Sequence, residues 1–194
     1  MSTSVLYMSM SLDGYIAGPD DKPGNPGGDG FMRLHTWYGY TEDGSSVEPS
    51  ATAQHFTNEF NATGAVLVGR RTAEQVEDYH GNHHGVPIFV VSHQPRRPET
   101  PSYPNVTYVT NGIASAMTQA KAAAGGRNVA VHGANLAQRA LEAGVLDEIQ
   151  IHQIPVLFGS GRRLFDVLPS RIELEIVRVI DAPDATHIRY RVRR

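Results

Sequence analysis

NVAVHGANLAQRALEAGVLDEIQIHQIPVLFGSGRRLF, residues 128–165, is the stretch of sequence that decides the fold. An apolar run at residues 129–131 ends at His132-Gly133-Ala134, apolar residues then recur at helical spacing, and a second apolar run covers residues 149–156. We therefore predict a strand, a glycine turn, a helix and a second strand in this order.

The glycine turn has the features of an anion site. A strand that ends in small residues before a helix leaves backbone N–H groups free at the positive end of the helix dipole. Gly133 and Ala134 would let a pyrophosphate approach that backbone, and Asn135 and Leu136 follow them in the first helical turn. The same residues are also consistent with an ordinary, closely packed connection, so the turn alone does not establish a site.

Composition limits the class of protein. With 194 residues and 40% hydrophobic content, the chain is long enough for one full core, and we predict a single domain over residues 1–194. The formal net charge of −3 gives no electrostatic reason to expect nucleic acid or a membrane as a partner. There are no cysteines, which excludes disulfides and thiolate metal sites. We expect a soluble, cytoplasmic protein.

A second strand end carries an acidic residue. The apolar run at residues 5–10 precedes SLDGYIAG, which places Asp13 just beyond the strand, where ligand contacts in open α/β sheets tend to lie. Asp13 is therefore a candidate for substrate binding and for catalysis. In an apolar, partly closed site its pKa would be raised, which suits a general acid. The alternative is that Asp13 only forms the turn with Gly14.

A third strand end carries two arginines. Residues 65–68 form a buried apolar run, and Gly69, Arg70, Arg71 and Thr72 follow at the start of a predicted helix. Two guanidinium groups and a hydroxyl group at a helix N-terminus favour phosphate.

A fourth strand, predicted at residues 87–92, ends in Ser92, His93 and Gln94. Between these two strands, HGNHH at residues 80–84 suggests zinc, but three convergent ligands are not evident in a Gly- and Asn-rich loop, so we predict no metal site.

Residues 20–50 form a long segment without a regular period. It is rich in Gly, Pro, Asp and Ser and contains the only tryptophan, Trp37, within an aromatic cluster. A loop of this length in a compact domain is usually functional or disordered. We interpret it as a lid or a wall of a substrate pocket in which Trp37 contacts the substrate. The alternative is that the aromatic residues cover a subunit interface.

The C-terminal segments predict a β-hairpin. Residues 172–181 and 187–192 flank Ala182-Pro183-Asp184, and apolar residues alternate with polar ones in the second segment. Taken with the earlier strand and helix pattern, this predicts an α/β fold of three layers with a mostly parallel central sheet and an antiparallel addition.

The order of these segments, SLDGYIAG, GRRT, VSHQP, HGANL and PVLFGSGRRLF, resembles the dihydrofolate reductase fold. More narrowly, it resembles the reductase domain of the bifunctional riboflavin-biosynthesis deaminase-reductase, over all but residues 20–50. The resemblance implies that NADPH lies across the strand ends. Gly69, Arg70, Arg71 and Thr72 would then hold phosphate groups, Ser92, His93 and Gln94 would flank the adenosine, and Gly133, Ala134, Asn135 and Leu136 would hold the pyrophosphate or nicotinamide side.

One departure concerns the substrate. Dihydrofolate reductases carry an acidic residue on the helix before the GRxT strand, and the resemblance places Ala53 there, with Glu59 more than a helical turn later. Asp13 is then the acidic residue expected to lie nearest the site of hydride transfer.

The function that follows is an NADPH-dependent reductase, expected to be a homodimer, acting on a C=N or C=O group of a small substrate such as a pterin or a pyrimidine. Hydride transfer needs no protein nucleophile, because the cofactor carries the chemistry. A non-catalytic nucleotide-binding protein and a dimeric scaffold are the alternatives.

Overall fold

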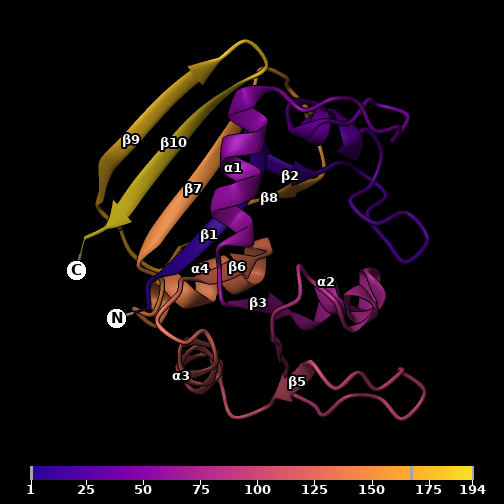
Figure 1. Ribbon diagram of the computed structural model, residues 1–194, viewed down its shortest axis with the longest axis vertical. Coiled ribbons are helices and arrows are strands. Elements are labelled where there is room, and N and C mark those ends of the chain that lie inside the picture. Colours follow the sequence, from indigo (N-terminus) through magenta and orange to yellow (C-terminus); the bar gives the residue numbers. More distant parts are fainter. Residues whose placement is uncertain (1, 167, 194) are drawn as a thin grey trace.

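The computed structural model describes residues 2–166 and 168–193, in which strands and helices alternate along the chain. Figure 1 shows them in sequence colours. The elements are β1 Ser4–Ser11, β2 Tyr15–Ala17, η1 Phe31–Tyr38, α1 Ala51–Asn61, β3 Ala65–Gly69, α2 Arg70–Gln75, η2 Glu77–Gly81, β4 Ile88–Val91, β5 Val106–Val109, α3 Ile113–Ala123, β6 Val129–His132, α4 Ala134–Glu142, β7 Glu148–Ile154, β8 Arg162–Arg163, β9 Leu174–Ala182 and β10 Ala185–Val192.

Within the described residues, eight strands form one sheet in the order β5-β4-β3-β6-β1-β7-β10-β9. The pairs from β5 to β7 are all parallel, whereas β10 is antiparallel to β7 and β9 is antiparallel to β10. The predicted α/β fold with a mostly parallel sheet and a C-terminal antiparallel hairpin is therefore confirmed.

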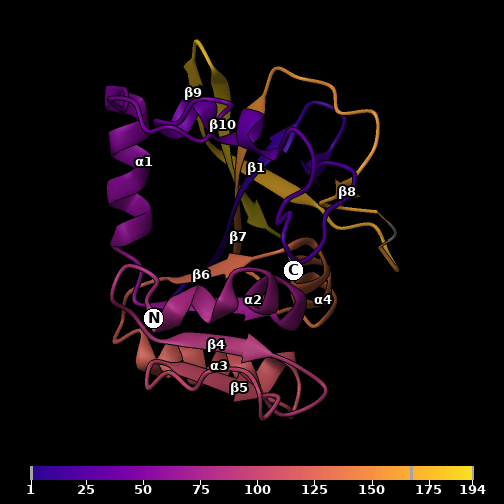
Figure 2. The same cartoon turned by 90° about the vertical axis from the view of Figure 1, so that its right-hand side faces the viewer.

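The sheet is covered on both faces. One face packs against α3 and α4 through apolar side chains that include Leu67, Met117 and Leu136. The other face packs against α2 and the end of α1, where Val66 and Ala73 are fully buried. Figure 2 shows α1 and α4 on opposite sides of the sheet. Each leucine removed completely from water contributes roughly 1.5–3 kcal/mol to this packing.

The segment between β2 and α1 is more regular than the sequence indicates. Residues 31–38 form the 3₁₀ helix η1, which is bounded by Gly30 and Gly39 with φ of 75° and 97°. These left-handed conformations suit glycine, and they start and stop the helix without side-chain caps. Helix α1 begins at residue 51 because Ser50 accepts the backbone N–H of Ala53 at 3.1 Å.

A small second sheet joins distant parts of the chain. Strand β2 pairs with β8, which brings the glycine-spaced loop beside the SLDGYIAG segment. Gly161 is required here, because its φ is 126° and an added Cβ would lie 2.1 Å from the carbonyl oxygen of Ala17. No helix among the described residues is long and apolar enough to cross a membrane.

Candidate functional site

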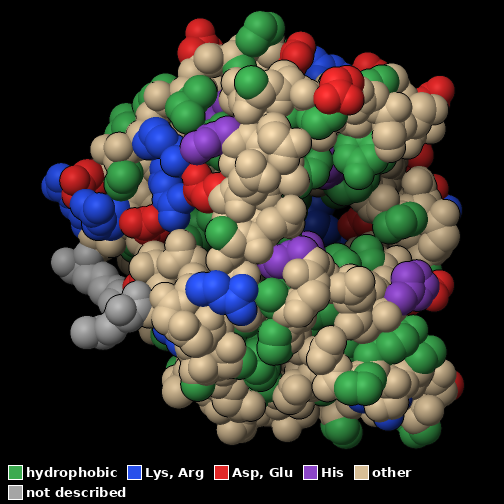
Figure 3. All heavy atoms as spheres, viewed as in Figure 1, with side chains coloured by type: hydrophobic (Ala, Val, Ile, Leu, Met, Phe, Trp, Pro, Cys, Tyr) green, Lys and Arg blue, Asp and Glu red, His purple; other side chains and the backbone are tan. Residues whose placement is uncertain are grey.

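A cleft of about 1430 Å³ opens at the carboxyl ends of β3, β4 and β6. Because parallel strands end at the same edge of a sheet, polar residues that follow different strands meet there. The molecule is hollowed between its upper and lower parts in Figure 3, with histidine side chains beside the hollow. The cleft is lined by eleven residues that the sequence analysis selected: Gly69, Arg70, Arg71, Thr72, Ser92, His93, Gln94, Gly133, Ala134, Asn135 and Leu136.

The two predicted phosphate segments lie against each other. The N-caps of α2 and α4 are Gly69 and Gly133, and neither helix start is capped by a side chain. Gly133 has a φ of 95°, and an added Cβ would lie 2.9 Å from Oγ1 of Thr72. This close approach needs glycine, and it brings two uncapped helix starts to one place. The residues present therefore fit a pyrophosphate group.

Arg70 is fixed by three side chains. Its Nε lies 2.8 Å from Oε1 of Glu74, and its Nη1 donates to Oγ of Ser92 at 3.3 Å and to Oε1 of Gln94 at 3.5 Å. The side chain of Arg70 is only 18% exposed. A guanidinium group held this way is preorganised, so a ligand phosphate that meets it loses less entropy than with a free side chain.

Arg71 has a partner that the sequence analysis missed. Its Nη2 donates to the backbone oxygen of Asp21 at 2.6 Å and to Oδ2 of the same residue at 3.1 Å. Oδ2 also accepts Nε of Arg162 at 3.1 Å, and Oδ1 accepts Nε2 of Gln75 and the backbone N–H of Gly27. Burial alone would raise the pKa of Asp21, but these hydrogen bonds lower it below its ordinary value.

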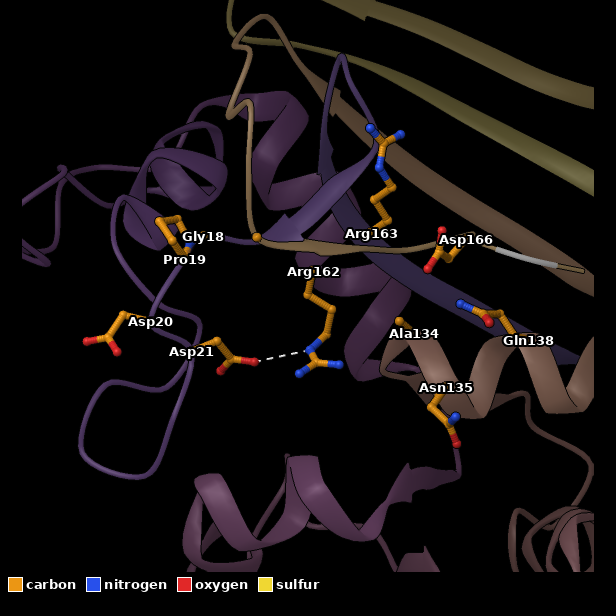
Figure 4. A pocket seen from close by; sticks show the side chains of 11 residues that line it. Gly18, Pro19, Asp20, Asp21, Ala134, Asn135, Gln138, Arg162, Arg163 and Asp166 are labelled. Atoms are coloured by element: carbon orange, nitrogen blue, oxygen red, sulfur yellow. Dashed lines mark hydrogen bonds and ion pairs between the residues drawn. The ribbon is translucent and has the colours of Figure 1, made fainter.

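The Asp21–Arg162 pair lines both the cleft and a smaller pocket. Figure 4 shows this pair beside the start of α4. The smaller pocket has a volume of about 480 Å³, and its polar lining includes Gln138 and Asp166. Asp21, Arg162, Ala134 and Asn135 line both spaces. Asp21 therefore holds two arginines from different segments where the two spaces share their lining.

Asp13 does not have the raised pKa expected of a general acid. Asp13 is not among the residues that line the cleft. Its carboxylate accepts Oγ of Ser11 at 2.6 Å and the backbone N–H groups of Phe158 and Gly159 at 3.1 and 2.7 Å. The hydrogen bond from Ser11, with those two backbone groups, lowers the pKa of Asp13 to about 2, so it is not raised. Asp13 ties the β1–β2 turn to the loop before β8.

Trp37, which we expected to contact a substrate, lies outside the lining of the cleft. Trp37 is buried. Its ring stacks on that of His152 with 4.2 Å between the ring centroids, and its Nε1 donates to Oγ of Ser9 at 3.0 Å. The surrounding loop nevertheless forms a wall of the cleft, as predicted, through Asp21, Pro26, Gly27, Phe31 and His35. Trp37 is linked to the cleft lining through Ser9 of β1, which itself lines the cleft.

Three aromatic residues of the cleft were not singled out as binding residues. His83, His132 and Tyr79 line it, and the ring of His83 lies 5.5 Å from His132 and 4.4 Å from Tyr79. His132 stands directly before Gly133, so its place at a strand end was a usable signal. In the part of the chain that the structure describes, no three His, Cys, Asp or Glu side chains are arranged to hold a metal ion.

Glu59 is not available to a ligand as an acidic group. It forms ion pairs with Arg178 and Arg189, and it accepts the hydroxyl group of Tyr7 at 3.3 Å. Ala53, at the position where dihydrofolate reductases carry an acid, is fully buried in α1. The described cleft therefore lacks the carboxylate expected of a dihydrofolate reductase.

Comparison with known proteins identifies the family of the chain and supports its fold. The family model described as the RibD C-terminal domain matches residues 3–187. A curated protein of Bacillus subtilis (strain 168), YwjB, which is described as uncharacterized, is 23% identical over 192 residues, with 96% of each chain covered.

Solved structures agree with this match. A putative riboflavin biosynthesis protein from Shewanella sp. PV-4 superposes with a TM-score of 0.75 at 21% identity, covering 99% of both chains. RibD of Acinetobacter baumannii superposes with a TM-score of 0.62 at 16% identity. A deaminase and 5-amino-6-(5-phosphoribosylamino)uracil reductase of Thermotoga maritima gives a TM-score of 0.59 at 13% identity. The chain covers 58% and 56% of these last two proteins.

Proposed function

The chain belongs to the RibD C-terminal domain family, the reductase domain of riboflavin biosynthesis, and we propose that it is an NADPH-dependent reductase of a small heterocyclic substrate. The observation that carries the proposal is the gathering of the three predicted cofactor-binding segments in one cleft. A volume of about 1430 Å³ exceeds the roughly 300–1,000 Å³ of ordinary ligand pockets, which suits a dinucleotide together with a substrate.

The binding roles follow from position. Gly69, Arg70, Arg71 and Thr72 would hold phosphate groups, since they combine two guanidinium groups, a hydroxyl group and an uncapped helix start. Ser92, His93 and Gln94 would flank the adenosine at the end of β4. The start of α4, from Gly133 to Leu136, would hold the pyrophosphate and the side near the nicotinamide.

The chemistry supplied by the bound cofactor would be hydride donation from its reduced nicotinamide. The protein would orient the two reactants and exclude water. Phe31 and His35 on the loop wall and Met8 on β1 provide apolar and aromatic surface for the substrate. With the carboxylate of Asp13 turned to Ser11 and the loop before β8, we assign it no part in proton transfer.

The test has two stages. A ligand that binds only the native state raises the free energy of unfolding by about 2.7 kcal/mol at a concentration of 100 times its dissociation constant. NADPH should therefore raise the melting temperature. Absence of any shift at saturating NADPH would refute the proposal. Loss of NADPH absorbance should then be followed with pterins, pyrimidines, quinones and 5-amino-6-(5-phosphoribosylamino)uracil. Stabilisation by NADPH without oxidation by any of them would favour a non-catalytic nucleotide-binding protein.

A homodimer is also proposed. Strand β9 is at the edge of the sheet, and Ile176, Val177 and Val179 on it are 63%, 42% and 54% exposed. An exposed apolar edge strand is normally protected or paired. Light scattering of the purified protein should give the mass of two chains, and Val179→Lys should shift it toward one.

A further inference from the structure

The large cleft has two regions of different charge. One region contains the basic side chains Arg70, Arg71, Arg97, Arg139 and Arg162. The other contains His83 and His132 with Tyr79, and the loop wall adds Phe31 and His35. If the arginines hold the phosphate groups of a dinucleotide, the histidine region is left for the second reactant. This step rests on the function proposed above.

His132 is the central residue of the histidine region. It is the last residue of β6, and its ring packs edge-on to Phe60 at 5.4 Å and parallel to His83 at 5.5 Å. Nε2 of His132 is buried and has no hydrogen-bond partner among the described residues. Buried polar atoms in folded proteins are nearly always hydrogen-bonded, so an unpartnered ring nitrogen on a residue that lines a cleft indicates a position for a ligand.

The backbone beside this region is strained. Four consecutive residues, Glu77, Asp78, Tyr79 and His80, have φ between 48° and 55°. A left-handed turn of residues other than glycine costs roughly 1–2 kcal/mol per residue, and such strain clusters at binding and catalytic sites. The turn is held by the hydroxyl group of Tyr108, which donates to the carboxylate of Asp78 at 3.0 Å. Its result is that the ring of Tyr79 lines the cleft next to His83.

The region carries no charge at neutral pH. Burial lowers the pKa of His132 to about 3 and that of His83 to about 4, and burial raises the pKa of Tyr79 to about 12. The neighbouring groups that act on the pKa of His132 are His83 and His84, which are themselves imidazoles. An anion placed here would lose its hydration without gaining a counter-charge, which costs several kcal/mol.

We propose that the region of His132, His83 and Tyr79 binds the uncharged, planar ring of the substrate, and that His132 determines specificity for a ring without a phosphate group. Each neutral imidazole has one donor and one acceptor nitrogen, so His132 and His83 together can pair with the N–H and C=O groups on the edge of a pyrimidine- or pteridine-type ring. Phe31 and Tyr79 supply aromatic surface to pack on such a ring. A substrate bearing a phosphate would need cations that this region does not supply.

The experiment compares ring compounds that differ only by a phosphate. Riboflavin is paired with flavin mononucleotide, and uridine with uridine 5′-monophosphate, each titrated into NADPH-saturated protein by calorimetry. We expect the uncharged member of at least one pair to bind about tenfold or more tightly than its phosphate ester. Equal or tighter binding of the esters, or no binding of any probe to protein that binds NADPH normally, would overturn the proposal. Failure to bind NADPH would instead refute the proposed reductase function.

Two substitutions separate recognition from structure. His132→Leu should weaken the uncharged ring about tenfold and leave NADPH affinity unchanged, whereas His132→Gln, which keeps donors and an acceptor, should restore part of the loss. His132→Leu should fold, because it replaces an unpartnered buried polar atom with an apolar group. If His132→Leu binds the uncharged ring as tightly as the wild-type protein does, the imidazole of His132 does not recognise the substrate.

Discussion

Replacing Asp21 with Asn tests the arrangement of charges at the mouth of the cleft. Asp21 bonds to Arg71 and Arg162, and its side chain is only 9% exposed, whereas that of Arg71 is 53% exposed. A cofactor phosphate on Arg71 would therefore sit beside the carboxylate that already occupies this arginine. We expect Asp21→Asn to bind NADPH more tightly than the wild-type protein.

The magnitude follows from the geometry. Two anions that share one guanidinium group lie about 6 Å apart, where unit charges interact by about 0.7 kcal/mol in water and about 2.8 kcal/mol at an effective dielectric constant of about 20. For a partly exposed site we expect NADPH to bind Asp21→Asn about 1–2 kcal/mol more favourably, which lowers Kd about 5–30-fold. The variant should also lose a little stability, since each exposed ion pair contributes about 0.2–1 kcal/mol.

The assay is titration of NADPH against intrinsic fluorescence, with urea unfolding measured in parallel. Asp20→Asn is the matched control, because it removes the same charge one residue away, where the carboxylate pairs with the exposed Lys22. It should change Kd far less. A Kd that is unchanged or weaker in Asp21→Asn would refute the reasoning and would mean that Asp21 is needed to hold the arginines in their binding positions.

Three further predictions follow from the same contacts. Arg71→Ala should weaken the binding of NADPH more than that of NADH, by about 1.5–3 kcal/mol if Arg71 contacts the extra phosphate. The control Arg171→Ala, whose side chain is 88% exposed, should change neither Kd. Asp13→Asn should lower the melting temperature without the roughly 100-fold loss of turnover that removal of a general acid causes; such a loss would restore its catalytic role. Burial lowers the pKa of His83, His132 and His187, so the free energy of unfolding should be highest above the unfolded-state pKa of about 6.5. Below that pH it should fall toward pH 4, by about 1.4 kcal/mol per pH unit for each histidine. Urea unfolding at pH 7 and 5 measures this difference, and equal free energies at the two pH values would contradict the prediction.

The sequence predicted which segments after β3, β4 and β6 meet in the cleft, for a physical reason. Gly69 and Gly133 follow buried parallel strands, and the carboxyl ends of such strands share one edge of the sheet. Local patterns at separate places in the chain are therefore enough to bring their residues together. The strand pairing did not have to be known in detail, because any parallel order places these ends on the same side.

Asp13 and Trp37 lie outside the cleft lining because long-range contacts determine their positions. The two backbone N–H groups that bind Asp13 come from residues 145 and 146 positions later in the chain. The position of Trp37 in η1 depends on His152, which lies on β7. Asp21 was missed for the same reason, since a Gly- and Pro-rich loop has no period that would indicate which residues its side chains meet. In each case, composition indicated a polar or aromatic residue but not its partner.

His132 and Gly133 show why the two halves of the cleft are coupled. Gly133 needs its left-handed φ of 95° and has no room for a Cβ beside Thr72, so the chain turns sharply directly after His132. That turn places an uncharged imidazole on one side and the uncapped start of α4 on the other. A pyrophosphate at α4 and a neutral ring at His132 would then be neighbours across a single residue. A nicotinamide joined to that pyrophosphate through one ribose would then lie within reach of a ring at His132, and hydride transfer requires these two rings to be in contact.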